Sequence, residues 1–170
     1  MEAPPAIEIV RAEGAAALAA VRSLFREYAD ALGVDLGFQD FEAELAALPG
    51  DYAAPGGVLL LALVDGQSAG CVGLRPLPGV DYPNASEMKR LYVRPAFRRF
   101  GLGRQLAQAL IDLATQLGYS SVLLDTLDDM EAARGLYVSL GFEEIPPYYF
   151  NPIAGAHYLK VDLDTPATRW

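Results

Sequence analysis

Hydrophobic and polar residues alternate over short stretches of this chain and follow helical spacing over longer ones. Strands are predicted where apolar residues alternate with polar ones, or run together between turn residues. These segments are residues 7–10, 58–64, 68–74, 86–93, 122–125 and 157–163. Asp65-Gly66, between the second and third of these segments, predicts the turn of a β-hairpin.

Helices are predicted where apolar residues recur every three or four positions. These segments are residues 15–32, 38–48, 102–117 and 130–140. Gly33 follows the first helix as a C-terminal cap, and Pro49-Gly50 stops the second. Strands and helices are thus mixed along the chain, with no repeat, linker or low-complexity tract. This pattern predicts a single α/β domain over residues 1–170.

Composition excludes several classes of protein. Hydrophobic residues make up 52% of the 170 residues, which is enough for a buried core, and no apolar run is as long as a membrane span. The formal net charge of −9 argues against nucleic acids and anionic membranes as partners, because both require a basic surface. The N-terminus also lacks the order of a signal peptide, so a cytoplasmic location is expected.

Cysteine and histidine are too scarce for disulfide or zinc chemistry. Cys71 is the only cysteine and His157 the only histidine, so no internal disulfide can form and no metal is expected. A single reduced cysteine also fits the cytoplasm. The sequence is compatible with a homodimer.

A glycine-containing loop at residues 98–104 lies between a predicted strand and a predicted helix. Such a loop binds anions, because its N–H groups have no partners within the helix and the helix dipole adds positive charge. Five of the thirteen Lys and Arg residues lie within residues 89–99. A basic segment in an acidic chain predicts a site for an anionic ligand.

Three phosphate-binding motifs compete for this loop. A Walker A loop needs Gly-Lys followed by Ser or Thr, whereas the chain has Gly103-Arg104-Gln105. A Rossmann fingerprint needs a small residue where the chain has Leu106. The third motif, Arg/Gln-x-x-Gly-x-Gly/Ala, binds the pyrophosphate of coenzyme A and matches Arg98-x-x-Gly101-x-Gly103. On the loop alone, an ordinary strand-to-helix turn remains the alternative.

Two strings on either side of the loop carry a resemblance to a known family. Leu91-Tyr92-Val93-x-Pro95 precedes the loop, and Ala133-x-x-Leu136-Tyr137-x-x-Leu140-Gly141-Phe142 follows it. The second string is similar to the Ala-x-x-Leu-Tyr-x-x-Leu-Gly-Phe signature of the GCN5-related N-acetyltransferase (GNAT) superfamily. The chain resembles this superfamily from about residue 58 to residue 142, and more loosely over its whole length.

The resemblance implies a fold and a cofactor. The fold is a twisted, mixed but mostly antiparallel sheet of about six to seven strands, flanked by about four helices. Its splayed central strands hold the implied cofactor, acetyl-CoA. The strand before the loop would pair with the pantetheine arm and polarise the thioester carbonyl from a backbone N–H near Leu91 or Tyr92, and the loop would hold the pyrophosphate. The implied cofactor-binding residues are Leu91, Tyr92, Val93, Arg98, Arg99, Phe100, Gly101, Leu102, Gly103 and Arg104.

The resemblance also implies two catalytic residues. Acetyl transfer needs a neutral amine and benefits from a proton donor for the departing thiolate. In the family, the tyrosine that matches Tyr137 is that acid; in the histone-acetyltransferase branch, a glutamate that matches Glu87 is the base. The alternatives are that Tyr137 only packs on an apolar helix face, and that Glu87 is a surface ion-pair partner of Lys89 and Arg90. Cys71 reads as a buried strand residue and not as a nucleophile.

One position departs from the family pattern. Many members place an asparagine that contacts CoA seven residues before the signature tyrosine, and this chain has Met130 there. Asp128 and Asp129 precede it, and they either line the acceptor side or favour the first turn of a helix. The departure puts one cofactor contact in doubt without affecting the predicted fold.

The acceptor is the least defined part of the prediction. Aromatic and acidic residues together suit a small organic cation or an amino acid. The candidate acceptor residues are Tyr28, Tyr82, Asp125, Tyr148 and Asn151. The predicted function is transfer of an acetyl group from acetyl-CoA to a primary amine of a small molecule or amino acid, by direct attack in a ternary complex. A non-catalytic acyl-CoA-binding or sensory module, another acyl-CoA donor and a protein amine as acceptor are the alternatives.

Overall fold

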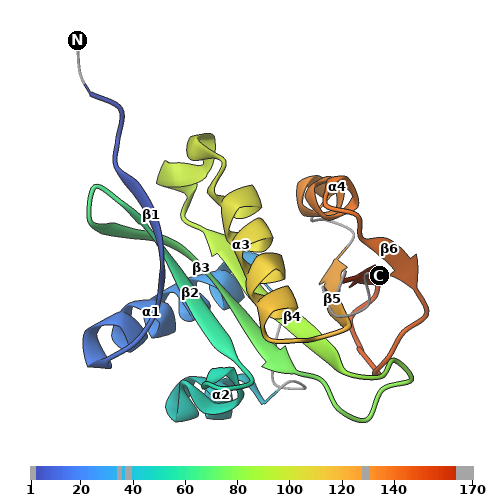
Figure 1. Cartoon of the computed structure of the whole chain (residues 1–170). Coiled ribbons are helices and arrows are strands. Elements are labelled where there is room, and N and C mark those ends of the chain that lie inside the picture. Colours follow the sequence, from blue (N-terminus) through green and yellow to red (C-terminus); the bar gives the residue numbers. More distant parts are fainter. Residues whose placement is uncertain (1–2, 34–35, 37–39, 128–130, 164–170) are drawn as a thin grey trace, which may run out of the picture.

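The structure is a computed structural model that describes residues 3–33, 36, 40–127 and 131–163. Within these residues, seven strands form one sheet, with α-helices on both of its faces (Figure 1). The strands are β1 (Ile7–Arg11), β2 (Val58–Val64), β3 (Gln67–Pro76), β4 (Ala85–Val93), β5 (Ser121–Leu127), β6 (Glu143–Ile145) and β7 (Ala156–Asp162). The α-helices are α1 (Ala15–Leu32), α2 (Phe41–Ala47), α3 (Leu102–Gln116) and α4 (Glu131–Ser139). Two short 3-10 helices are η2 (Gly50–Tyr52) and η3 (Pro95–Phe100).

The strand order is β1-β2-β3-β4-β5-β7-β6, and neighbours are antiparallel except for β4 and β5. The hairpin between β2 and β3 turns at Asp65 and Gly66, which both have positive φ, at 50° and 80°. Positive φ at both central residues matches the right-handed twist of the flanking strands. The predicted fold class, a mixed and mostly antiparallel sheet with flanking helices, is confirmed.

The central strands β4 and β5 pair over a short distance only. Their parallel register joins residues 85–87 of β4 to residues 121–123 of β5, and both strands continue well beyond it. They diverge past that point, as Figure 1 shows. A cleft lined by residues 88–91 of β4 and residues 124–126 of β5 lies in the middle of the sheet, where the two strands separate.

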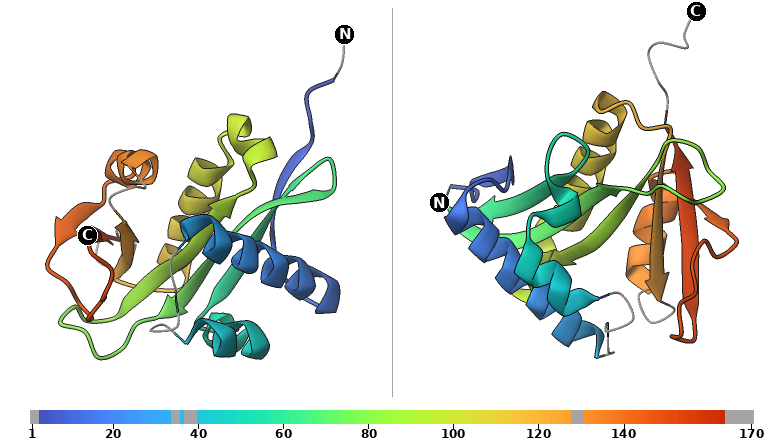
Figure 2. Two further views of the ribbon diagram at one scale, coloured as in Figure 1. Left: turned by 180° about the vertical axis from the view of Figure 1, so that it is seen from behind. Right: turned by 90° about the horizontal axis from the view of Figure 1, so that it is seen from below.

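Helices cover both faces of the sheet, as the two views in Figure 2 show, and each face has its own hydrophobic core. On one face, Leu102, Leu106 and Leu110 of α3 pack with Met88 of β4 and with Tyr137 of α4 in one buried cluster. These apolar residues recur at helical spacing, so α3 presents a continuous stripe to the sheet. The opposite face is covered by α1 and α2.

The core on the opposite face includes Leu24 and Phe25 of α1 and Leu45 of α2. Cys71 of β3 belongs to this second cluster and is fully buried. Burial raises the pKa of its thiol, which keeps the sulfur protonated and unreactive. The expectation that Cys71 is a buried strand residue is confirmed.

A β-bulge interrupts β4 where the cleft begins. The register pairs Gly73 with Lys89 and Cys71 with Tyr92, so Arg90 and Leu91 together lie opposite Val72. Arg90 has a φ of 63°, in the left-handed region that residues other than glycine rarely adopt. A bulge of this kind changes which face the following side chains occupy.

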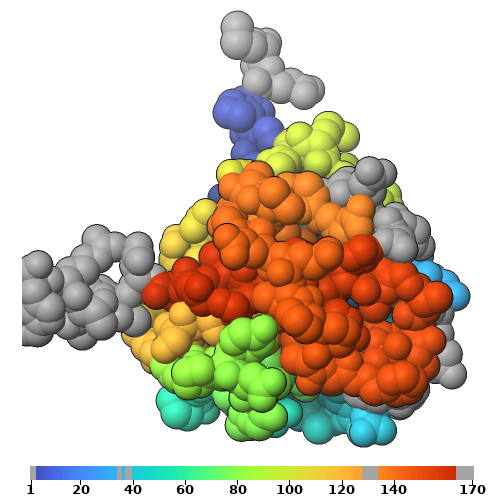
Figure 3. All heavy atoms as spheres, turned by 90° about the vertical axis from the view of Figure 1, so that its right-hand side faces the viewer, coloured from blue at the N-terminus to red at the C-terminus, as the bar shows by residue number. Residues whose placement is uncertain are grey.

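Several element boundaries differ from the sequence prediction. The strand β6 was not predicted, and residues 95–100 form a 3-10 helix where a loop was expected. The segment that joins β6 to β7 packs beside the loop between β3 and β4, on the side of the molecule seen in Figure 3. Residues 38, 128, 129 and 130, on which some predictions fell, lie outside the described residues.

Candidate active site

The glycine loop forms the N-terminus of α3. Gly101 precedes the helix with a φ of 70°. Its carbonyl accepts the first helical hydrogen bond, from the Gln105 N–H at 3.2 Å. The N–H groups of residues 102–104 lie ahead of that bond, where the helix supplies no acceptors. Gly101 provides no side-chain cap, and the first turn holds no acidic residue. The loop can therefore bind an anion through backbone N–H groups.

The arginines of this loop have contacts within the protein. Arg98 donates from Nε to the Val93 carbonyl at 3.0 Å, and the Arg99 guanidinium lies 4.7 Å from the centre of the Phe100 ring. Arg104 donates to the Ser139 hydroxyl at 2.6 Å and so joins α3 to α4. All three arginines are exposed, which leaves their charge accessible to a ligand.

The basic segment predicted for residues 89–99 is not one continuous patch. Lys89 and Arg90 are buried, and Arg90 points to the face that α1 and α2 cover. Arg94 pairs with Glu27 of α1 at 2.7 Å. The prediction that these five cations gather at the anion site is therefore wrong for Lys89, Arg90 and Arg94.

The cleft between β4 and β5 is lined by side chains from both halves of the molecule. Residues 88–91 of β4, residues 124–126 of β5, Tyr28 of α1 and Tyr137 of α4 surround it. Tyr137 is buried, and its ring meets the Phe142 ring edge to face at 5.6 Å. Burial, together with Tyr28 and the Asp125 carboxylate, raises the pKa of Tyr137, so its hydroxyl stays protonated at neutral pH.

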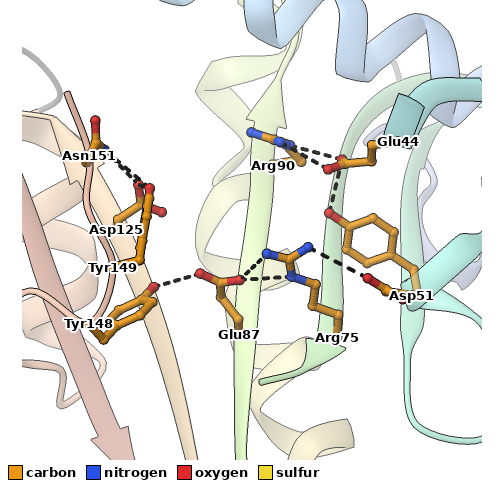
Figure 4. Close-up of polar contacts among 10 residues, drawn as sticks. Glu44, Asp51, Arg75, Glu87, Arg90, Asp125, Tyr148, Tyr149 and Asn151 are labelled. Atoms are coloured by element: carbon orange, nitrogen blue, oxygen red, sulfur yellow. Dashed lines mark hydrogen bonds and ion pairs between the residues drawn. The ribbon is translucent and has the colours of Figure 1, made fainter. Parts of the chain in front are cut away.

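Glu87 lies at the closed end of this cleft and is 1% exposed. Its Oε1 accepts a hydrogen bond from Arg75 Nε at 2.9 Å and forms an ion pair with Arg75 Nη2 at 2.8 Å. Its Oε2 accepts a hydrogen bond from the Tyr148 hydroxyl at 2.8 Å (Figure 4). The alternative that Glu87 is a surface charge is wrong, since the residue is buried and paired with Arg75 on the neighbouring strand.

Asp125 faces the cleft from β5 and is held by neutral donors. The Tyr149 hydroxyl donates to Asp125 Oδ2 at 2.5 Å, and the Asn151 amide donates to the same oxygen at 3.4 Å (Figure 4). Burial and the Asp125 carboxylate raise the pKa of Tyr149, which keeps the phenol protonated and donating. The segment between β6 and β7 thus places polar groups against the end of β5.

Arg90 makes a second polar cluster on the same face of the sheet. Its Nε and Nη2 donate to the two carboxylate oxygens of Glu44, each at 3.1 Å, and the Tyr52 hydroxyl donates to Glu44 at 3.1 Å. Burial opposes the charge on Arg90, but the Glu44 carboxylate outweighs it and raises the pKa of the guanidinium. This cluster fastens α2 to the bulge of β4.

The structure brings together most of the residues predicted from the sequence. Tyr28, Asp125 and Tyr137 line one cleft, while Tyr148 and Asn151 contact Glu87 and Asp125. Tyr82 is not brought to the cleft; its ring lies 5.2 Å from the Lys160 ammonium.

Sequence reasoning missed two partners of these residues, Arg75 and Glu44. Arg75 and Glu87 face each other across paired strands, at Cα partners of the β3–β4 register. The alternation of β3, extended to residue 75, could have placed Arg75 beside Glu87. Glu44 lies 46 residues from Arg90, and no local pattern links the two.

Comparison with known proteins identifies the family to which this chain belongs. The sequence model of the acetyltransferase (GNAT) family matches residues 18–142, and the chain belongs to that family. An N-acetyltransferase of Schizosaccharomyces pombe, described as uncharacterised, is 42% identical over 143 residues, which cover 84% of this chain and 86% of that protein.

Solved structures share the fold. A GNAT-family acetyltransferase from Staphylococcus aureus superposes with a TM-score of 0.75 at 21% identity, over 94% of this chain and all (100%) of that one. A Salmonella typhimurium structure with its cofactor acetyl-CoA superposes with a TM-score of 0.72 at 23% identity, over 94% of this chain and 95% of that one. The chain is therefore an N-acetyltransferase of the GNAT family. In the part of the chain that the structure describes, no helix has the length and apolar character needed to cross a membrane.

Proposed function

We propose that the enzyme transfers the acetyl group to a primary amine of a small molecule or an amino acid, by direct attack within a ternary complex. The observation that carries this proposal is the cleft between β4 and β5, where Tyr137 of α4 and Asp125 of β5 line one opening. Tyr137 reaches the opening from the α3 and α4 side of the sheet, and Asp125 contacts the segment between β6 and β7. Donor and amine can therefore enter from opposite sides and meet there.

The donor side fits acetyl-CoA. We propose that residues 98–104 hold the pyrophosphate through the backbone N–H groups at the start of α3, with the side chains of Arg98, Arg99 and Arg104 adding charge. We further propose that Leu91, Tyr92 and Val93 pair their backbone with the pantetheine arm. The edge of β4 that faces β5 is open beyond the parallel register, which ends at Glu87. That open edge supports the assignment.

Proton transfer is assigned to two residues. We propose that Tyr137 donates to the departing thiolate, because a buried phenol with a raised pKa keeps its proton at neutral pH. We propose Glu87 as the base that receives the proton of the amine. The Tyr148 hydroxyl, which donates to Glu87 and lines the neighbouring pocket, provides the route between the amine and the buried carboxylate.

The test is an acceptor screen. Purified enzyme is incubated with acetyl-CoA and single primary amines (amino acids, monoamines, diamines and a short peptide), and release of the CoA thiol is followed together with the mass of the acetylated product. We expect release with at least one small amine. Release with the peptide alone would overturn the small-molecule acceptor in favour of a protein amine. Thermal stabilisation by acetyl-CoA without turnover on any amine would favour a binding module.

A further inference from the structure

The bulge of β4 contains a residue whose backbone conformation is unfavourable. Arg90 has a φ of 63°, and for a residue with a Cβ the left-handed backbone costs about as much as a tenfold change in an equilibrium. Glycine would adopt this conformation freely, but the chain has arginine here. Strain of this kind persists only where the surrounding structure imposes it. The contacts of the Arg90 side chain are therefore the place to look for what holds the bulge.

The Arg90 guanidinium is fixed by one carboxylate and two aromatic rings. Glu44 of α2 accepts hydrogen bonds from Arg90 Nε and Nη2, each at 3.1 Å (Figure 4). The rings of Tyr28 and Phe41 lie against the same guanidinium. Glu44 is held in turn by the Tyr52 hydroxyl, which donates to it at 3.1 Å. With Arg90 only 4% exposed, this side chain anchors the bulge to α2.

The extra residue in the bulge sets which backbone groups face the open edge of β4. Successive residues of an antiparallel strand direct their N–H groups alternately to the two neighbouring strands. Arg90 and Leu91 together lie opposite Val72, so this alternation shifts by one position beyond the bulge. The register between β4 and β5 ends at Glu87. The bulge therefore determines which N–H groups of residues 91–93 point towards β5 and the cleft.

This segment is where the proposed reaction needs an accurately directed donor. In the proposed function acetyl-CoA lies along residues 91–93, and a backbone N–H near Leu91 or Tyr92 polarises its thioester carbonyl. Such a donor stabilises the charge that develops on the oxygen only when it is aimed at that oxygen. Arg90 lines the cleft together with Tyr137, the proposed acid. The strained residue is thus adjacent in the chain to the proposed donor.

We propose that Glu44 is a positioning residue for the acetyl transfer: through its ion pair with Arg90, it holds the bulge of β4 in the conformation that directs a backbone N–H of residues 91–92 at the thioester carbonyl. The inference rests on the proposed placement of acetyl-CoA along β4, and it gives helix α2 a part in the reaction. The proposed pyrophosphate loop begins α3 on the other face of the sheet, so it should not depend on Glu44.

The first test is rescue by glycine. Arg90→Ala and Arg90→Gly remove the same ion pair, but only glycine adopts the left-handed backbone without strain. With acetyl-CoA and an amine identified in the acceptor screen, kcat of Arg90→Gly should exceed that of Arg90→Ala by about tenfold. Equal kcat values in the two variants would overturn the inference, because the conformation of residue 90 would then not affect the reaction.

The second test is made at Glu44 itself. Glu44→Gln removes the charge but keeps the size of the side chain, so kcat should fall by about tenfold or more, since the misdirected donor acts in the transition state. The dissociation constant of CoA should change by less than about threefold, because the loop at the start of α3 is intact. The same substitution made in Arg90→Gly should cause no further fall in kcat, because glycine does not need the pair.

Glu42→Gln is the matched control on the same helix. Glu42 forms an exposed pair with Arg26, and kcat should equal that of the wild type. Circular dichroism at the assay temperature establishes that each variant is folded. If Glu44→Gln does not fold, the comparison of Arg90→Gly with Arg90→Ala still decides the question. A wild-type kcat in folded Glu44→Gln would overturn the inference.

Failure of the inference and failure of the proposed function are distinguishable. Turnover of a small amine that is insensitive to Glu44→Gln would overturn the inference and leave the proposed function standing. Turnover of a peptide amine alone would overturn the small-molecule acceptor, and the same variants would then test the inference with the peptide. No turnover of any amine by the wild type would overturn both, since the inference assigns the ion pair a part in that reaction.

Discussion

Arg90 and Glu44 form a bidentate ion pair between the bulge of β4 and helix α2, with two N···O distances of 3.1 Å. The guanidinium also lies 5.1 Å from the centre of the Phe41 ring and 5.8 Å from that of Tyr28. Arg90 is 4% exposed and has a left-handed backbone, so its conformation depends on these contacts. The pair joins the helix that covers the acceptor side to the strand proposed to hold the cofactor.

Replacing Glu44 with alanine should strongly destabilise the protein. Arg90 would be left as a buried charge without its carboxylate, a change that typically lowers the free energy of unfolding by about 3–5 kcal/mol. Denaturant unfolding followed by circular dichroism measures the effect. Glu42→Ala on the same helix is the matched control, because Glu42 and its partner Arg26 are exposed and should change stability by no more than about 1 kcal/mol. Equal effects of the two substitutions would contradict the structural role of the buried pair.

Gly101 and Gly103 should respond differently to alanine. A Cβ at Gly103 would meet only Leu136, at 3.7 Å, and alanine favours a helix over glycine, so Gly103→Ala should keep or raise the melting temperature. It should still weaken acetyl-CoA binding about tenfold or more if the pyrophosphate lies against this backbone. Gly101→Ala should lower stability by about 1–2 kcal/mol, because Gly101 has a φ of 70°. Calorimetric titration and thermal melts separate the two effects; unchanged affinity in Gly103→Ala would argue against the assigned cofactor loop.

Local sequence patterns correctly predicted the elements whose boundaries depend on residues close together in the chain. Helix α1 begins and ends where the sequence predicted, with Gly33 as its cap at a φ of 66°, and β2 matches residue for residue. In both elements, the apolar spacing and the flanking turn residues indicate the same boundaries. By contrast, the three-residue strand β6 forms only because β7 pairs with it, and its own residues carry no strand pattern.

The acceptor side could not be predicted in the same way, because it depends on register. A run of cations at residues 89–99 suggested one anion site, but the bulge at Arg90 and the alternation of β4 distribute these side chains over different surroundings. Glu87 was selected through its spacing from the loop, whereas its partner Arg75 lies on another strand and Tyr148 in the tail. The loop and the signature helix are local motifs, and they were found from the sequence.

Replacing Tyr137 with phenylalanine should slow turnover and preserve cofactor binding. The substitution removes only the hydroxyl proposed as the acid, and general acid catalysis typically contributes about a hundredfold or more. Single-turnover rates and the dissociation constant of CoA distinguish the two properties. Tyr119→Phe is the control: its hydroxyl donates to the Gly56 carbonyl, away from the cleft, and its kcat should match the wild type. An unchanged rate in Tyr137→Phe would remove the residue from the acid role.

Replacing Glu87 with glutamine tests the proposed base. Glutamine keeps the shape but cannot take a proton, so kcat should fall by about a hundredfold while the affinity for CoA is unchanged. Asp51→Asn is the matched control, because Asp51 contacts the same Arg75 at 3.9 Å while it remains exposed. Wild-type kcat in Asp51→Asn with loss in Glu87→Gln is the expected pair of results. A kcat in Glu87→Gln close to that of the wild type would remove Glu87 from the role of base.

Four tyrosines with raised pKa values predict unfolding at alkaline pH. Burial raises the pKa of Tyr28 to about 12, from an ordinary value of 10.0, and it raises the pKa values of Tyr137, Tyr148 and Tyr149 as well. A raised pKa in the folded state gives stability that is complete below the unfolded value of 10.0 and is lost as pH rises through the folded values. A tenfold change in a protonation equilibrium corresponds to about 1.4 kcal/mol, which is a large fraction of the stability of an ordinary domain.

We therefore expect the free energy of unfolding to fall steeply above pH 10.0. Tyrosinate absorbance should rise together with the loss of circular dichroism, because the phenols ionise when the chain unfolds. Lys89 acts in the opposite direction. Because its pKa is lowered in the folded state, its contribution to the free energy of unfolding increases as pH rises towards the ordinary value of 10.5. In Tyr28→Phe one of the ionising groups is removed, so the slope of stability against pH should be shallower than in the wild type. Tyrosinate that forms fully near pH 10.0 in a chain with native circular dichroism would show that these phenols are accessible to solvent, and would contradict the burial of the cleft residues.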